Sequence, residues 1–182
     1  MKEGVNDPNQ KRYVDGILRS TESIRDECVF AKSYIDIGIK TPSWQKLDVV
    51  LINASASLSL RGAQLRRRVD NLDIFADPLL ETVFHNLFDN SLGHGERVKN
   101  ISVTAAPWDS GWQIVVEDDG IGIPDELKER IFEEGFGKNT GLGLHLCRRI
   151  LAITDITLME EGRWGEGARF VMRVPMDRIR NG

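Results

Sequence analysis

The chain has 182 residues, enough for about one domain that folds without disulfide or metal crosslinks. Hydrophobic residues make up 41% and charged residues 29%, and the net charge of −4 argues against nucleic acid or an anionic membrane as the main partner. Cys28 and Cys147 show no metal-binding spacing, and no run of 18 apolar residues occurs. We therefore expect a cytoplasmic protein with no membrane segment in this chain, or else the soluble end of a membrane sensor.

The first regular pattern predicts a helix over residues 8–38. Two interleaved series recur every seven residues, the first at Ile17, Ile24, Ala31 and Gly38 and the second at Thr21, Cys28 and Ile35. Such series indicate a seam that packs on a partner helix, and an amphipathic helix docked on its own domain remains the alternative. Gly38 and Pro42 end the helix, so a hinge is expected over residues 38–44.

The rest of the chain predicts helices and strands that group by type. Helices are expected over 47–60, 78–91 and 143–153, and strands over 66–77 in two pieces, 101–108, 112–118, 156–162 and 168–174. Asp77 and Pro78 supply the N-cap and first turn of the second helix. This grouping predicts an α+β fold: a two-layer sandwich of a mixed sheet of about five strands covered by about three helices, preceded by one long N-terminal helix.

Three segments carry residues suited to binding chemistry. In the first, HNLFDNS (85–91), Asn86 and Asn90 are four residues apart and share a helix face, where their amide oxygens suit Mg²⁺. A buried hydrogen-bonded pair is the alternative. In the second, EDDGIGIP (117–124), an acid at a strand end can accept a hydrogen bond from an exocyclic amine and so distinguish adenine from guanine. A tight turn with solvated acids is the alternative here.

The third segment, residues 135–144, is rich in glycine. It has glycines at 135, 137, 141 and 143 and leads into a predicted helix, so backbone N–H groups and a positive helix end face anions. Lys138 adds a cation. The segment is not a P-loop, because Asn139 follows the lysine, and it is not a dinucleotide fingerprint, because Leu146 stands where the third glycine is required.

In this order the segments resemble the catalytic ATP-binding domain of histidine kinases, in the superfamily that includes gyrase and mismatch-repair ATPases. HNLFDNS is similar to the N box, EDDGIGIP to the G1 box, IFEEGF (131–136) to the F box and NTGLGL (139–144) to the G2 box. The run GFGKNTGLGLHLCRRIL is similar to archaeal sensor kinases. The resemblance implies a catalytic ATP-binding domain over 44–180. It implies a remnant of the second dimerisation helix over 1–40.

The resemblance also implies roles for single residues. Asn90 is the Mg²⁺ ligand, Asn86 supports the phosphate and metal site, and Asp118 binds the adenine amino group. Residues 124–140 form a mobile ATP lid held by Phe132 and Phe136. The remaining implied nucleotide-binding residues are Gly120, Gly122, Ile123, Gly137, Lys138, Thr140, Gly141, Leu142, Gly143 and Leu144.

Three departures from the family pattern stand out. Gly93 occupies a position that is often basic, so a phosphate contact is expected to be lost or to be taken over by a neighbour such as Lys99 or Arg97. Ala168 replaces a frequent Ser or Thr near the adenine. No histidine fits the phosphoacceptor box. His85, His94 and His145 are expected to be structural, so the chain supplies no catalytic histidine of its own.

The implied function is to bind Mg-ATP and present its γ-phosphate to a histidine outside this chain, as an ATP:protein-histidine phosphotransferase that cannot autophosphorylate alone. The alternatives are a nucleotide-gated interaction module without turnover and a serine kinase of the anti-sigma-factor type. Expected partners are ATP, a phosphoacceptor helix, a response regulator receiver domain and, through residues 10–38, a second copy of the chain. No nucleic acid is expected.

Overall fold

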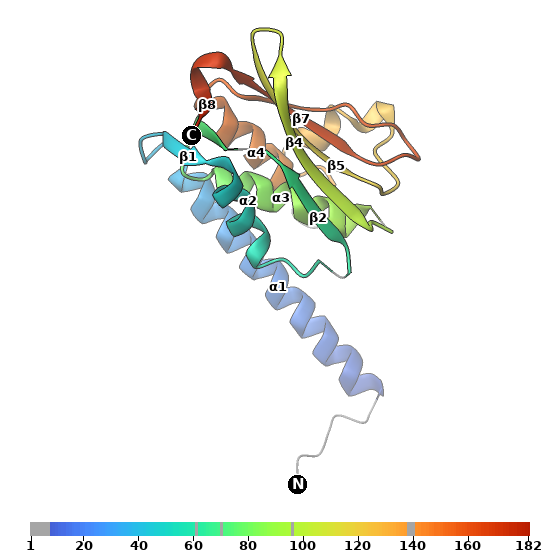
Figure 1. Ribbon diagram of the computed structural model, residues 1–182. Coiled ribbons are helices and arrows are strands. Elements are labelled where there is room, and N and C mark those ends of the chain that lie inside the picture. The colour runs from blue at the N-terminus through green and yellow to red at the C-terminus, as the bar shows by residue number, and fades with distance from the viewer. Residues whose placement is uncertain (1–7, 61, 70, 96, 138–140) are drawn as a thin grey trace.

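The computed structural model describes residues 8–60, 62–69, 71–95, 97–137 and 141–182. A long helix, α1 (Pro8–Asp36), projects from a body of helices and sheet (Figure 1). The body contains α2 (Leu47–Ala56), α3 (Leu80–His94) and α4 (Gly143–Ala152), with 3-10 turns η1 (Asp125–Leu127), η2 (Arg130–Phe132) and η3 (Met176–Arg178). Its strands are β1 (Ser43–Lys46), β2 (Gln64–Arg68), β3 (Leu72–Ala76), β4 (Asn100–Trp108), β5 (Gly111–Asp118), β6 (Thr157–Glu160), β7 (Arg169–Pro175) and β8 (Ile179–Asn181).

The main sheet has five strands in the order β2-β4-β5-β7-β6. The β2–β4 pair is parallel and the other pairs are antiparallel, so the predicted mixed five-strand sheet is confirmed. Helices α2, α3 and α4 lie on one side of it (Figure 1). On β5, Ile114, Val116 and Asp118 alternate and are all buried, which places the carboxylate on the strand face that also carries core residues.

A second sheet, β1-β3-β8, is antiparallel and was not expected from the sequence. The two strands expected over 66–77 are present, but they belong to different sheets. Their burial explains the separation: β3 buries Leu72, Ile74 and Ala76, whereas β2 exposes Arg66, Arg67 and Arg68. The first strand of this sheet, β1, lies partly within the segment expected to be a hinge, which leaves residues 38–42 outside any regular element.

Several helix boundaries differ from the expected ones: α1 ends at Asp36 rather than residue 38, and α3 continues to His94 rather than residue 91. Helix α2 ends at Ala56 rather than near residue 60. Helix α3 starts at Leu80, because Asp77 closes a turn before it: its Oδ1 accepts from the Leu79 backbone N at 2.8 Å and its carbonyl from the Leu80 N at 2.9 Å. Asp77 Oδ2 also accepts from the Gly38 backbone N at 3.2 Å, so this aspartate joins the end of the N-terminal segment to the start of α3.

Helix α1 carries its sevenfold series on its surface. All the positions in both series are exposed, with Ile17, Ile24 and Ile35 between 61% and 70% exposed. The seam is therefore not docked on the rest of this chain. Within the described residues, no helix has the length and apolarity needed to cross a lipid bilayer.

Candidate functional site

A cavity of about 920 Å³ lies where α3, the segment after β5, the lid and the start of α4 meet. It brings together residues from all three candidate segments: Asn86, Asn90, Asp118, Gly122, Ile123, Gly137, Gly141, Gly143 and Leu144. Leu142 and Gly120 are not among the lining residues. Lys138 and Thr140 lie outside the described residues, so their expected contacts stay predictions. Arg25 and Ser33 of α1 also line the cavity, which was not expected from the sequence.

Asp118 presents a buried carboxylate to this cavity, with 5% of the residue exposed. Its Oδ2 accepts from Ser91 Oγ at 2.7 Å, and its Oδ1 accepts from the backbone N–H groups of Gly120 at 2.9 Å and Ala168 at 3.2 Å. A carboxylate has about four acceptor positions, so three donors leave one position for a ligand amine. The contact from Ser91 comes from the end of the N box and was missed at the sequence level.

The neighbouring acid, Asp119, holds the backbone at the start of β4. It is exposed, and its carboxylate accepts from the backbone N–H groups of Lys99 at 2.7 Å and Asn100 at 3.0 Å, and from Asn100 Nδ2 at 2.8 Å. Although desolvation opposes the shift, these hydrogen bonds lower the pKa of Asp119. Asp118, the last residue of β5, therefore faces the cavity, whereas Asp119, just after the strand, fixes the start of β4.

Asn86 and Asn90 share one face of α3, and both line the cavity. Asn86 Nδ2 donates to the Gly143 carbonyl at 3.4 Å and contacts Cys147 Sγ at 3.7 Å, so this amide fixes the start of α4. The side chain of Asn90 makes no hydrogen bond to the described part of the chain and is half-buried. Its amide oxygen is a hard donor, which suits Mg²⁺ held by few protein ligands together with phosphate oxygens.

The glycines after β5 are needed for backbone packing. A Cβ on Gly120 would lie 2.7 Å from the Gly95 Cα, and one on Gly122, where φ is +73°, would lie 2.6 Å from the Arg163 carbonyl oxygen. Gly167 packs against the carbonyl of Asp118 in the same way. These contacts press the 161–168 loop and the end of α3 onto Asp118. Gly120, one of the implied nucleotide-binding residues, is covered by Gly95 and does not line the cavity, so its contact with a nucleotide stays a prediction.

The described part of the lid, residues 124–137, is attached to the body through aromatic side chains. Phe132 is 4% exposed and packs edge-on against Phe170, with ring centroids 6.4 Å apart. Arg148 of α4 stacks on Phe132 with its Cζ 3.5 Å from the ring centroid. Phe136 lines the cavity beneath Arg130, whose Cζ lies 4.7 Å from that ring. Leu127 and Ile131 line it as well, so the lid forms one wall of the site.

The histidines and the departures from the family pattern have clear places. His85 Nδ1 is 3.1 Å from the Ala54 carbonyl and His145 Nδ1 is 3.2 Å from the Phe132 carbonyl. His85 also lines the cavity, so the structural roles expected for these histidines stay predictions. The side chain of His94 lies outside the described residues. Neither Arg97 nor Lys99 lines the cavity, so their expected phosphate contacts stay predictions. Ala168 lines it and offers its backbone to Asp118.

Cys147 lies behind the Asn86 amide and is fully buried. Burial raises the pKa of its thiol to about 12, although the hydrogen bond from Asn86 opposes the shift. At pH 8 we expect a thiolate fraction of about 10⁻⁴, too small for reaction at an inaccessible sulfur. A thiol reagent should therefore titrate exposed Cys28 at once and Cys147 only after guanidinium is added. Fast reaction of two thiols in the folded protein would contradict this.

Comparisons with known proteins agree with this geometry. A family model described as histidine kinase-, DNA gyrase B-, and HSP90-like ATPase matches residues 76–178. The adaptive-response sensory kinase SasA of Prochlorococcus marinus subsp. pastoris is 29% identical over 191 residues, which cover 91% of this chain and 50% of that protein. The chain spans half or less of the length of this relative and of two other curated sensor proteins that it matches.

Solved structures give the same result. The nucleotide-free catalytic domain of histidine kinase ThkA is 27% identical and matches with a TM-score of 0.65 over 75% of this chain and 98% of that one. ThkA in complex with the response regulator protein TrrA matches at 23% identity and 0.70, over 96% and 54%. Full-length ShkA in complex with AMPPNP matches at 22% and 0.71, over 93% and 39%. Because the TrrA complex of ThkA and the ShkA structure are only 23% and 22% identical to this chain, these two matches show the shared fold alone. The resemblance to the catalytic ATP-binding domain of histidine kinases is thus confirmed, and the chain belongs to the family of histidine kinase-, DNA gyrase B-, and HSP90-like ATPases.

Proposed function

We propose that this chain is the ATP-binding part of a two-component histidine kinase, which binds Mg-ATP and presents its γ-phosphate to a histidine outside the chain. The observation that carries the proposal is Asp118, a buried carboxylate with three protein donors and one acceptor position left, in a cavity shared with Asn86 and Asn90. An adenine amino group supplies the donor that this position lacks. Guanine would place a carbonyl there and leave the carboxylate unpaired.

The chain's own residues bind and orient the nucleotide. Asp118 holds the base, and the start of α4 at Gly143 faces the phosphates with the positive end of the helix. Asn90 would hold Mg²⁺, which neutralises phosphate charge when bound. The lid residues Leu127, Ile131 and Phe136 exclude water from the site. Transfer needs positioning more than a protein base: an imidazole nitrogen forms the N–P bond as the bond from phosphorus to the ADP oxygen breaks.

The partners follow from the same proposal. ShkA binds AMPPNP and ThkA binds a response regulator, which supports an adenine nucleotide and a receiver domain as ligands of this kinase. The exposed sevenfold series on α1 supports a helix of the phosphoacceptor hairpin as the segment that covers it. A homodimer through residues 10–38 fits the same surface.

A transfer assay tests the proposal. The chain is incubated with γ-labelled ATP, Mg²⁺ and a separate hairpin that carries the acceptor histidine, and we expect label on the hairpin that is lost in acid. Label stable to acid would identify a serine kinase, and ATP binding without transfer would identify a nucleotide-gated module. Either result would contradict the proposed histidine phosphotransfer. A hairpin whose histidine is replaced by glutamine is the matched control and should stay unlabelled.

A further inference from the structure

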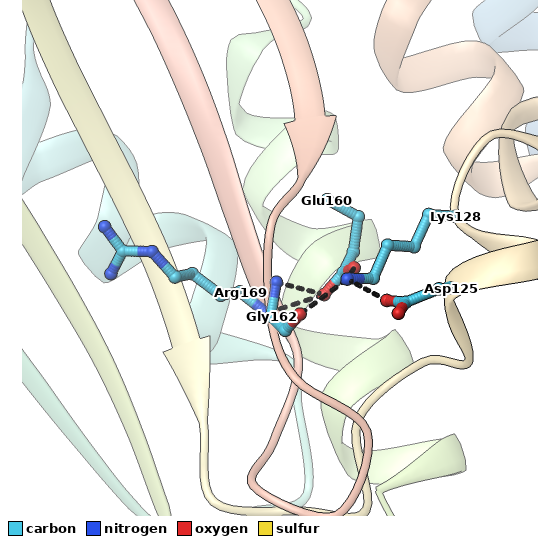
Figure 2. A network of polar contacts seen from close by, with 5 residues as sticks. All are labelled: Asp125, Lys128, Glu160, Gly162 and Arg169. Atoms are coloured by element: carbon cyan, nitrogen blue, oxygen red, sulfur yellow. Dashed lines mark hydrogen bonds and ion pairs between the residues drawn. The ribbon is translucent and has the colours of Figure 1, made fainter.

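A second buried carboxylate, outside the predicted site, lies beside the lid. Glu160 at the end of β6 is 6% exposed, and its Oε1 accepts from the backbone N–H groups of Gly162 at 2.9 Å and Arg169 at 3.0 Å (Figure 2). Its Oε2 is buried and has no hydrogen-bond donor among the described residues. The nearest cation is Lys128, whose Nζ lies 3.7 Å away. A buried charge of this kind is costly unless a partner stays in place.

Lys128 connects the lid to this carboxylate. Its Nζ donates to the Gly162 carbonyl at 2.6 Å and pairs with Asp125 Oδ1 at 2.7 Å, as Figure 2 shows. The hydrogen bond to Asp125, followed by the charge of Glu160, raises the pKa of Lys128 despite some desolvation, so the ammonium is charged at neutral pH. We call Asp125, Lys128, Glu160 and Gly162 the Lys128 network.

The lid residues on either side of Lys128 reach the cavity. Leu127 and Ile131 both line it, so a shift of Lys128 moves the wall that covers the nucleotide. The neighbouring Phe132 contact with Arg148 fixes the far end of this segment. Asp125, at the near end, pairs with Lys128 Nζ, and Glu129 between the two ends pairs with Arg148.

The loop that Glu160 closes ends at the adenine-binding carboxylate. Residues 161–168 leave Glu160 and return to Ala168, whose N–H donates to Asp118 Oδ1 at 3.2 Å and whose carbonyl accepts from the Asp118 N–H at 3.0 Å. Within this loop, Gly165 N donates to the Ile121 carbonyl at 2.7 Å. The Lys128 network therefore joins the lid, at Asp125 and Lys128, to the 161–168 loop, at Gly162. The far end of that loop, Ala168, holds Asp118.

We propose that Lys128 and Glu160 are a positioning pair that couples lid closure to the orientation of Asp118. The pair keeps the lid and the base-binding carboxylate in one fixed arrangement. This inference rests on the proposed nucleotide binding. Neither residue lines the cavity, so we expect neither to touch the nucleotide. Without the pair, the lid and the 161–168 loop move independently. The nucleotide then has to order both segments when it binds, which lowers its affinity.

The test uses Lys128→Met, Glu160→Gln, the double variant, and Lys46→Met as a control that removes an exposed lysine from the three-stranded sheet. Glutamine keeps an oxygen for Gly162 and Arg169 but loses the attraction to Lys128. Calorimetry gives ATP affinity well below each melting temperature, and hydrogen exchange follows residues 125–137 and 161–168. We expect ATP affinity to fall about tenfold in each single variant and no further in the double variant. Both segments should exchange faster in each single variant.

The outcomes separate the inference from the proposed function. If the unmodified chain does not bind ATP, the proposed function falls and this inference falls with it. If it binds and both single variants match Lys46→Met in affinity, with only the melting temperature lowered, the pair is merely structural and this inference alone is wrong. If Glu160→Gln does not fold, the affinity of Lys128→Met decides between these outcomes, because that side chain is near the surface, and Lys128→Arg should restore affinity.

Discussion

Replacing Asn90 with alanine should abolish the magnesium-dependent part of ATP binding. The side chain lines the cavity and makes no hydrogen bond to the described part of the chain, so its removal breaks no hydrogen bond there and should leave the melting temperature nearly unchanged. Because removing even an outer partner of a metal site costs 10- to 100-fold, losing a direct ligand should lower ATP affinity by about 100-fold with Mg²⁺ present. Calorimetric titrations with Mg²⁺ and with EDTA measure this difference.

The matched control is Asn53→Ala, which removes another amide that lines the same cavity but stands on α2, outside the N box. It should bind Mg-ATP as the unmodified chain does. If Asn90→Ala keeps the full gain in affinity on adding Mg²⁺, the assignment of Asn90 as the metal ligand is wrong. If both variants lose ATP affinity equally, the loss is caused by the lower polarity of the cavity and not by the loss of a metal ligand.

The sequence predicts the main sheet and the cavity wall because the necessary signals are local. Alternation along residues 112–118 gives both the strand and the face of Asp118, and a spacing of four places Asn86 and Asn90 on one helix face. The second sheet was not predicted because β1 and β8 are short. Each of them pairs only with β3, which is far from both in the sequence. Strands of three or four residues carry too little pattern to be recognised.

The support of the site was also beyond local patterns. Ser91 donates to Asp118 across 27 positions, and Gly95 covers Gly120 across a similar distance. Glu160 and Lys128 lie in segments that look like an ordinary strand end and an ordinary charged turn. Only the fold brings these residues together, because each contact joins elements that no local pattern indicates as neighbours.

Replacing Asp118 with asparagine should lower ATP affinity and reduce the preference for ATP over GTP, each by about 10- to 100-fold. The amide oxygen can still accept from Gly120 and Ala168, which directs the new NH₂ toward the Ser91 hydroxyl and the remaining position at Oδ2. That position then donates, so it repels the adenine amino group and suits the guanine carbonyl. Competitive titration of ATP and GTP in the presence of Mg²⁺ gives the ratio directly.

Two controls isolate the role of the base-binding oxygen. Asp119→Asn makes the same chemical change one residue later, at an exposed carboxylate that binds Lys99 and Asn100, and should leave the ATP/GTP ratio unchanged. Ser91→Ala removes one donor to Asp118 but keeps the acceptor, so ATP should bind more weakly with its preference retained. If the ATP/GTP affinity ratio of Asp118→Asn equals that of the unmodified chain, this carboxylate supports the loop but does not contact the base. A contact with the base would make the ratio depend on whether this position accepts or donates a hydrogen bond.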